Sequence, residues 1–264
     1  MEPTAYLNRI GLDSQPAATL TGVEQLQSAH VQTVPFENLA IVGDPFNDGT
    51  KSRWPATGVE LSLPSLYEKI VERERGGFCF ELNGLFTWFL RELGVGADRL
   101  AARMLGEDGT GRPPANHHTV AVEFDRRYLV DVGMGTPQMR RPLPLDGEVV
   151  TEETGVAWRV VESERPDEAF LTQFRHPDEP WQDRYLFSDV PRELSYFHAT
   201  CEYLASAPES PFTGDPTVSI ATADGYQKLT KNSLRWWDGT EHERAVTPEE
   251  WDELRTDQFG LRYV

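Results

Sequence analysis

The sequence predicts an α+β fold in which helices come first, an antiparallel sheet or barrel follows, and a small mixed segment ends the chain. Three observations support this order. Apolar residues recur at helical spacing up to about residue 95, short alternating runs continue to about residue 190, and strand-like and helical patterns mix thereafter. Hydrophobic residues make up 39% of the 264 residues, which is enough for a packed core and argues against disorder.

Two helices are predicted in the first part. One extends from Leu63 to Glu74, with Ser62 as its cap and Pro64 in its first turn. After an interruption at 75–79, a second helix is indicated by Leu82, Leu85, Phe86, Phe89, Leu90 and Leu93, which recur at i, i+3, i+4, i+7, i+8 and i+11. Gly94 stands where a C-terminal cap is expected. We assign residues 1–95 to this helical part.

The middle part, 96–190, contains strand-like runs at 99–105, 118–124, 127–133, 156–163 and 184–188, separated by Pro and Gly. The last part, 191–264, begins with a predicted helix over 192–205. Two strands that turn at Asp224-Gly225 follow. A final helix opens at Thr247-Pro248-Glu249-Glu250, which is a capping box with Pro at the first helical position.

The charge of the chain excludes some classes of partner. It has 25 basic and 43 acidic residues, a net charge of −18, so its surface repels nucleic acid and anionic lipid. It contains no apolar run of about 18 residues, so no membrane helix is expected. The N-terminus lacks the basic and apolar pattern of a signal segment, which makes the cytoplasm the expected location.

The basic residues are unevenly divided, because only four of the 25 are Lys. An acidic surface poor in Lys suggests a protein that works in concentrated salt, where its self-repulsion is screened. An ordinary acidic cytosolic protein is the alternative. Equal folding and activity in dilute buffer and in molar KCl would contradict the salt-adapted hypothesis.

The two cysteines, Cys79 and Cys201, do not form a CxxC motif, so neither a zinc ribbon nor a redox pair is expected, and no metal site is predicted. A disulfide is not expected in a reducing cytosol. A single Cys in a distinctive local context is a candidate nucleophile.

Cys79 lies in such a context, Arg75-Gly76-Gly77-Phe78-Cys79-Phe80-Glu81-Leu82-Asn83-Gly84. Two glycines allow a sharp turn and the approach of a ligand to the backbone. Cys79 then falls at the start of a helix, where free N–H groups and the helix dipole favour a thiolate and can stabilise an oxyanion. The alternative is a buried structural Cys beside a glycine turn.

The second cluster is a predicted β-hairpin that brings a His near Asp131. Adjacent side chains alternate along a strand, so only one of His117 and His118 can share a face with Asp131. A three-residue loop, Asp125 to Arg127, selects His117, whereas a two-residue loop selects His118. Either His, oriented by a carboxylate, could take the proton of a Cys nucleophile.

The third cluster, 35–39, is a weaker signal. Phe36 is a candidate pocket wall, and Glu37 is a candidate ion-pair partner for Arg75. A short loop that packs on the core explains these residues equally well.

Together these clusters resemble the arylamine N-acetyltransferase family. The matching segments are PFENL (35–39), RGGFCFELNGLF (75–86), HHTVAVEF (117–124) and YLVDVGMG (128–135), with a weaker match in SAPESPF (206–212). The resemblance implies an N-terminal helical bundle, a central antiparallel β-barrel and a C-terminal α/β lid. It also implies a Cys-His-Asp triad arranged as in papain-type cysteine proteases.

The resemblance assigns roles to individual residues. Cys79 matches the nucleophile of the family and Asp131 its carboxylate. Alignment of the His strand on Val122 and Phe124 makes His117 the catalytic match, although the turn that follows is one residue shorter than usual in the family.

Five further matching residues concern the surroundings of the triad. Phe36, Phe78 and Met134 are the implied walls of the acceptor pocket, and Met134 stands where the family usually has Phe. Glu37 and Arg75 are the implied ion pair beneath the site.

The implied activity is acetyl transfer from acetyl-CoA, as co-substrate, to a small aromatic amine or hydrazine through an acetyl-Cys intermediate, with no bound cofactor. An amide synthase of the same fold, acting on a carrier-bound acyl chain, and a cysteine hydrolase are the alternatives. A non-catalytic binding protein of the same fold is disfavoured by the intact Cys79 and Asp131.

Overall fold

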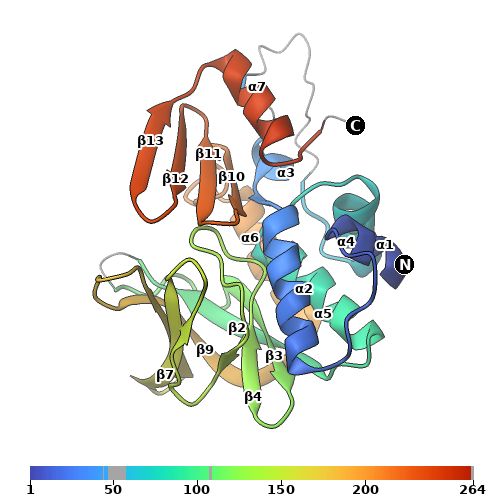
Figure 1. Ribbon diagram of the computed structural model, residues 1–264, viewed down its shortest axis with the longest axis vertical. Helices are drawn as coiled ribbons and strands as arrows, with labels where there is room; N and C mark the ends of the chain where they lie inside the picture. Colours follow the sequence, from blue (N-terminus) through green and yellow to red (C-terminus); the bar gives the residue numbers. More distant parts are fainter. Residues whose placement is uncertain (44, 47–57, 107–108, 263–264) are drawn as a thin grey trace.

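The computed structural model describes residues 1–43, 45–46, 58–106 and 109–262. It confirms the α+β class: helices pack on one side of a large antiparallel sheet, and a second, smaller sheet stands at the end of the molecule above both (Figure 1). The helical elements are α1 (Pro3–Arg9), α2 (Leu20–Thr33), α3 (Leu39–Val42), α4 (Leu63–Tyr67), the π-helical η1 (Glu68–Glu72), α5 (Cys79–Glu92), the 3-10 turn η2 (Leu194–Phe197), α6 (His198–Ser206) and α7 (Pro248–Asp257).

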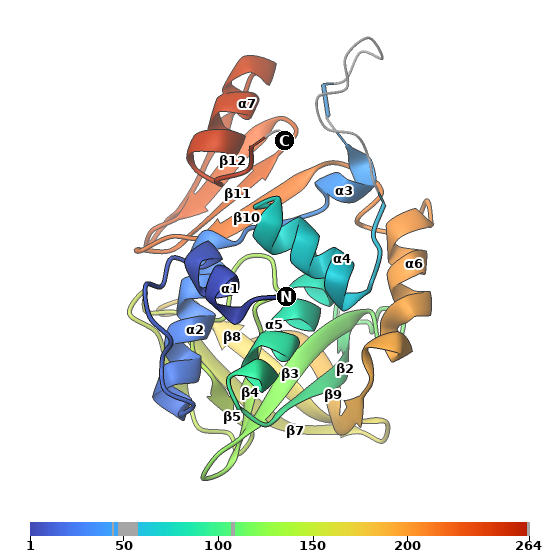
Figure 2. The same cartoon turned by 90° about the vertical axis from the view of Figure 1, so that its right-hand side faces the viewer.

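Helix α5 lies at the centre of the molecule, between strands β2 (Ala97–Met104) and β3 (His117–Glu123) on one side and α1 and α4 on the other (Figure 2). Every residue from Cys79 to Leu90 is buried, because other elements cover the helix on all sides. Such a helix has no face that must be polar for contact with water. Full burial of each Leu or Phe side chain contributes about 1.5–3 kcal/mol. The helix ends where the sequence predicts, since Gly94 has φ 81° and takes the left-handed conformation of a C-terminal cap.

The helix predicted over Leu63–Glu74 is partly confirmed. Ser62 caps α4 by accepting a hydrogen bond from the N–H of Ser65. Its second half is not α-helical: in η1 the N–H of Arg73 donates to the carbonyl of Glu68, five residues earlier. From this wider turn, Lys69 reaches the start of α5.

Within the described residues, eight strands form the large sheet in the order β5-β4-β3-β2-β9-β8-β7-β6, and β5 packs beside β7 to nearly close a barrel. All neighbouring strands in it are antiparallel. These strands are β2 (Ala97–Met104), β3 (His117–Glu123), β4 (Arg127–Val130), β5 (Leu143–Pro144), β6 (Val150–Thr151), β7 (Ala157–Arg165), β8 (Glu168–Arg175) and β9 (Gln182–Arg192).

The smaller sheet has the strand order β1-β10-β11-β12-β13: β1 (Phe36–Glu37), β10 (Thr217–Ala221), β11 (Tyr226–Thr230), β12 (Ser233–Trp237) and β13 (Glu241–Ala245). Its edge strand β1 comes from the N-terminal part of the chain, and Phe36 pairs with Ser219. The C-terminal sheet is therefore joined by backbone hydrogen bonds to the segment that carries Phe36 and Glu37. The predicted turn at Asp224-Gly225 and the predicted capping box at Thr247 are both present.

Among the described residues, no helix is long and apolar enough to cross a membrane.

His30 provides a prediction about the pH dependence of stability. Its side chain is fully buried in α2, and Nδ1 lies 2.7 Å from the hydroxyl of Tyr6. Burial first, and then the charge of Arg9, lower the pKa of His30 from 6.5 to about 3. The unfolded chain takes up a proton near its ordinary pKa, and the folded chain does so only near 3. The free energy of unfolding therefore falls as the pH drops through this interval, by about 2 kcal/mol at pH 5.

In the His30→Gln variant, which keeps a polar partner for Tyr6, this contribution is absent. The free energy of unfolding is therefore to be measured by urea denaturation at pH 7 and at pH 5. The decrease from pH 7 to pH 5 should be smaller in the variant than in the parent protein by about 2 kcal/mol. An identical loss in both proteins would contradict the assignment to His30.

Candidate active site

The register of the β3–β4 hairpin decides which His faces Asp131. Val120 pairs with Val130 and Glu123 with Arg127, so three residues, 124–126, form the loop. The loop therefore begins one residue earlier than the predicted loop 125–127. As a result, each residue of β3 pairs with a residue of β4 that lies two positions from its predicted partner. A shift of two preserves the face on which each side chain lies. His117 accordingly shares a face with Asp131, as the three-residue alternative requires.

His117 and Asp131 are in direct contact, with 2.6 Å between Nε2 and Oδ2. Both side chains are buried. Because Nε2 is engaged by Asp131, Nδ1 is the ring nitrogen left to exchange a proton with a substrate or a thiol. His118 lies on the other face of β3, where its ring stacks on Phe197 at 4.5 Å between centroids. Burial lowers the pKa of His118 well below its usual value, as expected for a neutral core histidine.

Every polar contact of the Asp131 carboxylate is a hydrogen bond that it accepts. Oδ1 accepts from Nδ2 of Asn83 at 2.8 Å and from the N–H of Gly133 at 2.9 Å. Oδ2 accepts from His117 and, at 3.0 Å, from the hydroxyl of Tyr185. Burial alone raises the pKa of Asp131, but the charge of His117 and these hydrogen bonds hold it below its ordinary value. The carboxylate is therefore ionised and fixed in position.

Cys79 is the first residue of α5, as predicted, and its Sγ lies 3.9 Å from the carbonyl of Asn116. Burial raises the pKa of the thiol well above its ordinary value, and the negative charge of Asp131 adds to the rise, whereas the backbone N–H groups of His118 and Phe80 oppose it. The expectation that the helix end favours a thiolate is thus outweighed by burial. Ionisation of Cys79 needs a neighbouring base that becomes a cation.

Cys79 and His117 line one pocket of about 230 Å³. Apart from these two side chains, its walls are apolar except at Asn116 and Arg112. The other lining residues are Phe36, Met104, Leu105, Gly133, Met134, Gly135, Pro211 and Phe212. The pocket therefore joins a nucleophile–base pair to an apolar chamber that accepts a flat ring.

The three predicted wall residues differ in their placement. Phe36 and Met134 line the pocket. Phe78 does not, because its ring turns into the core at the start of α5 and packs edge-on against Phe80 and Phe212. Phe78 thus supports Phe212, which lines the pocket and belongs to the weakly matching 206–212 segment.

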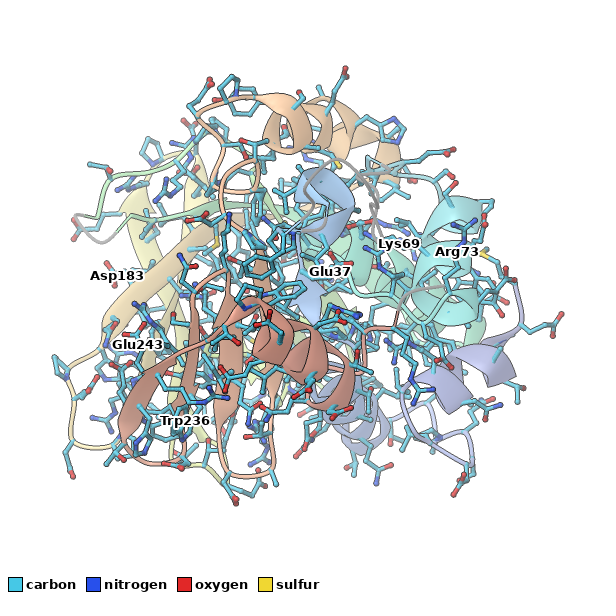
Figure 3. All side chains as sticks on the ribbon, turned by 90° about the horizontal axis from the view of Figure 1, so that it is seen from above. Glu37, Lys69, Arg73, Asp183, Trp236 and Glu243 are labelled. Atoms are coloured by element: carbon cyan, nitrogen blue, oxygen red, sulfur yellow. The ribbon has the colours of Figure 1, made fainter. Side chains whose placement is uncertain are left out.

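The predicted ion pair between Glu37 and Arg75 is present at 3.3 Å, and it belongs to a larger buried cluster. Lys69 lies 3.8 Å from Glu37 and 2.7 Å from Glu81. Figure 3 labels Lys69 and Glu37 of this cluster. Burial raises the pKa of Glu37, but the charges of Lys69 and Arg75 prevail and lower it. Glu81 also accepts a hydrogen bond from the N–H of Phe78, so the cluster fixes the backbone just before Cys79.

Two glycines of the predicted motifs are required by close packing. A Cβ at Gly133 would lie 2.8 Å from the Cα of Cys79, so only Gly lets the 131–135 segment approach the nucleophile. A Cβ at Gly76 would overlap the carbonyl oxygen of Pro35. The space that we expected for a ligand at this turn is therefore filled by the neighbouring backbone.

Sequence reasoning did not predict that Asn83 and Tyr185 bind Asp131, or that Arg112 lines the pocket. Asn83 lies one turn beyond Cys79 in the quoted motif, so its position on the face of Cys79 could have been noticed. Tyr185 reaches Asp131 from β9, 54 residues away in sequence, and nothing local indicates this contact.

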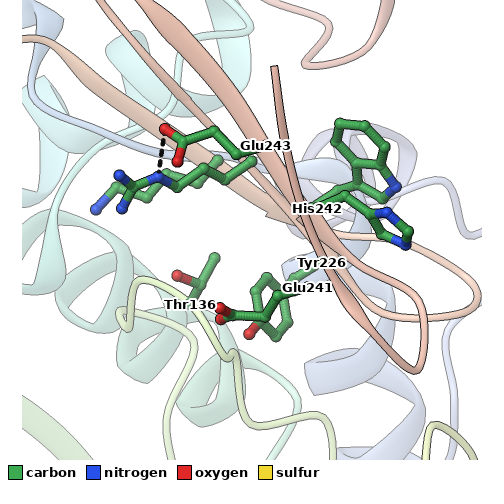
Figure 4. Close-up of a pocket in the computed structure, with 8 residues that line it drawn as sticks. Thr136, Tyr226, Glu241, His242 and Glu243 are labelled. Atoms are coloured by element: carbon green, nitrogen blue, oxygen red, sulfur yellow. Dashed lines mark hydrogen bonds and ion pairs between the residues drawn. The ribbon is translucent and has the colours of Figure 1, made fainter. Parts of the chain in front are cut away.

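A second cavity, of about 470 Å³, lies against the smaller sheet and contains none of the predicted site residues. Figure 4 shows Thr136, Tyr226 and Glu241 among the residues that line it, and a dashed line marks the Arg235–Glu243 ion pair. It is larger than the pocket at Cys79, but its lining residues include no Cys–His pair. The candidate chemistry therefore belongs to the smaller pocket.

Comparison with known proteins agrees with this geometry. A family model described as N-acetyltransferase matches residues 19–264. The arylamine N-acetyltransferase of Mycolicibacterium smegmatis is 31% identical, covering 99% of this chain and 92% of its own. Human arylamine N-acetyltransferase 1 is 31% identical, covering 89% of this chain and 82% of its own.

The solved structure of Mycobacterium marinum arylamine N-acetyltransferase in complex with CoA superposes with a TM-score of 0.85, at 29% identity, over 98% of this chain and 93% of its own. The matches extend over the helical part, the barrel and the C-terminal sheet. This chain therefore belongs to the arylamine N-acetyltransferase family.

Proposed function

We propose that this protein transfers an acetyl group from acetyl-CoA to aromatic amines and hydrazines by a ping-pong mechanism. Cys79 is the nucleophile, His117 the acid and base, and Asp131 the carboxylate that orients His117. The observation that carries the proposal is the shared pocket: Cys79 and a carboxylate-bound His117 line one small apolar chamber.

In the first half-reaction, Nδ1 of His117 takes the proton of the buried thiol as Sγ attacks the carbonyl carbon of the thioester. The first N–H groups of α5 have no partner within the helix and can stabilise the oxyanion that forms. The bond between the acetyl carbon and the sulfur of CoA then breaks, and the imidazolium returns its proton to the departing CoA thiolate.

In the second half-reaction, the aromatic amine enters the emptied pocket and attacks the acetyl carbon. His117 accepts the proton of the amine while the carbon–Sγ bond breaks, and Cys79 is released to be protonated again. The ionised Asp131 stabilises the imidazolium in both steps.

Residues 191–264 are proposed to act as the lid that keeps water from acetyl-Cys79. Pro211 and Phe212 of this part line the pocket, and Nδ2 of Asn38 donates to the carbonyls of Phe212 and Asp215. We also propose the cytoplasm as the location, since both cysteines are free and thiols persist in a reducing compartment.

Intact mass spectrometry tests the proposal. Acetyl-CoA alone should add the mass of one acetyl group, and an aromatic amine added afterwards should remove it and appear as its amide. Spontaneous loss to water would instead indicate a hydrolase. No adduct from acetyl-CoA would contradict the proposed donor.

A further inference from the structure

The pocket at Cys79 carries a positive charge that the acetyl transfer itself does not require. Arg112 is the only side chain among its described lining residues that always carries a charge. The chain as a whole has a net charge of −18, so Arg112 places a positive charge at this pocket within a predominantly acidic protein.

Arg112 has no acidic partner among the residues that the structure describes. None of the described residues forms an ion pair with its guanidinium, whereas nearby Arg103 binds Glu168 at 2.8 Å. An arginine without a carboxylate keeps its planar set of donors available for a ligand. Since the side chain is exposed, the interaction it offers is moderate in strength rather than that of a buried ion pair.

The backbone of Arg112 is held to the catalytic residues by a short series of contacts. Its N–H donates to the carbonyl of Met104 at 3.0 Å, and the N–H of Met104 donates to Oδ1 of Asn116 at 2.8 Å. The carbonyl of Asn116 in turn lies 3.9 Å from Sγ of Cys79. The backbone that carries this cation is thus hydrogen-bonded to the wall that holds the nucleophile.

The size of the pocket limits what this cation can meet. A cavity of about 150 Å³ holds one benzene ring, and the pocket here has about 230 Å³. It therefore suits a single ring with small substituents. The donor phosphates and a carboxylate on the acceptor are the two anions that could meet this cation, and the two half-reactions distinguish them because the phosphates take part only in the first.

We propose that Arg112 makes this enzyme selective for aromatic amines that carry a ring carboxylate, of the aminobenzoate class. The inference rests on the proposed function, because it concerns the acceptor in the second half-reaction. The guanidinium receives the carboxylate of the ring while the amino group of the same ring meets acetyl-Cys79.

The two half-reactions can be measured separately. The enzyme is first acetylated with p-nitrophenyl acetate, and acetyl transfer is then followed to 4-aminobenzoate and to its neutral analogue 4-aminobenzamide. The Arg112→Gln variant should lose about fivefold to tenfold in kcat/KM for 4-aminobenzoate and less than about twofold for the amide. Comparing each variant with the parent removes the difference in intrinsic reactivity between the two amines.

Arg165→Gln is the matched control. Arg165 is an exposed neighbour that donates to the carbonyl of Gly109 at 3.3 Å but does not line the pocket. The Arg165→Gln substitution removes the same charge from the same region. The ratio of kcat/KM for 4-aminobenzoate to kcat/KM for 4-aminobenzamide should remain as in the parent. Arg112→Lys should keep part of the preference, since it retains the charge but not the two-pronged geometry.

If the ratio of kcat/KM for 4-aminobenzoate to kcat/KM for 4-aminobenzamide were the same in Arg112→Gln as in the parent, the inference would be overturned. A loss confined to acetylation by acetyl-CoA, with acetylation by p-nitrophenyl acetate intact, would also overturn it and assign Arg112 to the donor phosphates. If the parent protein formed no adduct with acetyl-CoA but still transferred acetyl from p-nitrophenyl acetate to 4-aminobenzoate, the donor proposed above would fail while the inference on Arg112 stood.

Discussion

The Cys79→Ala variant should form no acetyl adduct with acetyl-CoA and transfer no acetyl group to an aromatic amine. The mechanism forms and breaks a covalent bond at Sγ, and no other thiol lines the pocket described here. Removing a nucleophile abolishes the covalent route and leaves at most the small acceleration due to binding. Intact mass spectrometry after incubation with acetyl-CoA measures this directly.

Cys201→Ala is the matched control, because Cys201 is the other free cysteine and is equally buried, at 3% exposed. It belongs to α6 and does not line the pocket, so its variant should acquire the acetyl group at the rate of the parent. A persistent adduct on Cys79→Ala, or its loss in Cys201→Ala, would show that the wrong thiol has been assigned.

Asp131→Asn should reduce the rate of Cys79 acetylation by about 10³-fold to 10⁴-fold, the size of loss that the equivalent change causes in serine-protease triads. All contacts of this carboxylate come from donors, namely His117, Tyr185, Asn83 and the N–H of Gly133. An amide NH₂ has to face at least one of them. The imidazole then loses the acceptor that keeps the proton on Nε2, and Nδ1 no longer serves as a free base.

Tyr185→Phe is the graded comparison. It deletes one hydrogen bond to Oδ2, at 3.0 Å, and leaves the charge and the His117 contact in place. The expected loss is about tenfold, the value of one hydrogen bond to a charged group. Stopped-flow acetylation by p-nitrophenyl acetate at several pH values gives both rates, and circular dichroism checks that each variant is folded. Equal losses in the two variants would mean that the carboxylate has no role beyond that of the Tyr185 bond.

Much of the site could be predicted from residues that are close together in sequence. The periodicity from Leu82 to Leu93 predicts α5, the glycines before it predict a turn, and Cys79 consequently begins the helix. The Asp131-Val132-Gly133 segment is also locally readable, since Gly133 permits the approach to Cys79 that its neighbours require. These features depend on backbone geometry and on the short-range spacing of side chains.

The choice between His117 and His118 could not be made in this way. It depends on the number of residues in the turn after Glu123, because a one-residue difference in that turn exchanges the faces of the strand. The barrel fixes the register through the pairing of β3 with both β2 and β4.

By itself, the sequence determined the α+β class, the helix that presents Cys79 and the resemblance to the family, and that resemblance in turn implied the pairing of Glu37 with Arg75. Only the tertiary structure decided that Tyr185 and Asn83 hold Asp131, that Lys69 joins Glu37 to Glu81, and that Phe212 rather than Phe78 lines the pocket. The physical reason is one of range. Helix periodicity, caps and turns are set by neighbours within a few residues, whereas contacts between separate elements, such as Tyr185 with Asp131 across 54 residues, exist only once the folded core has excluded the other arrangements.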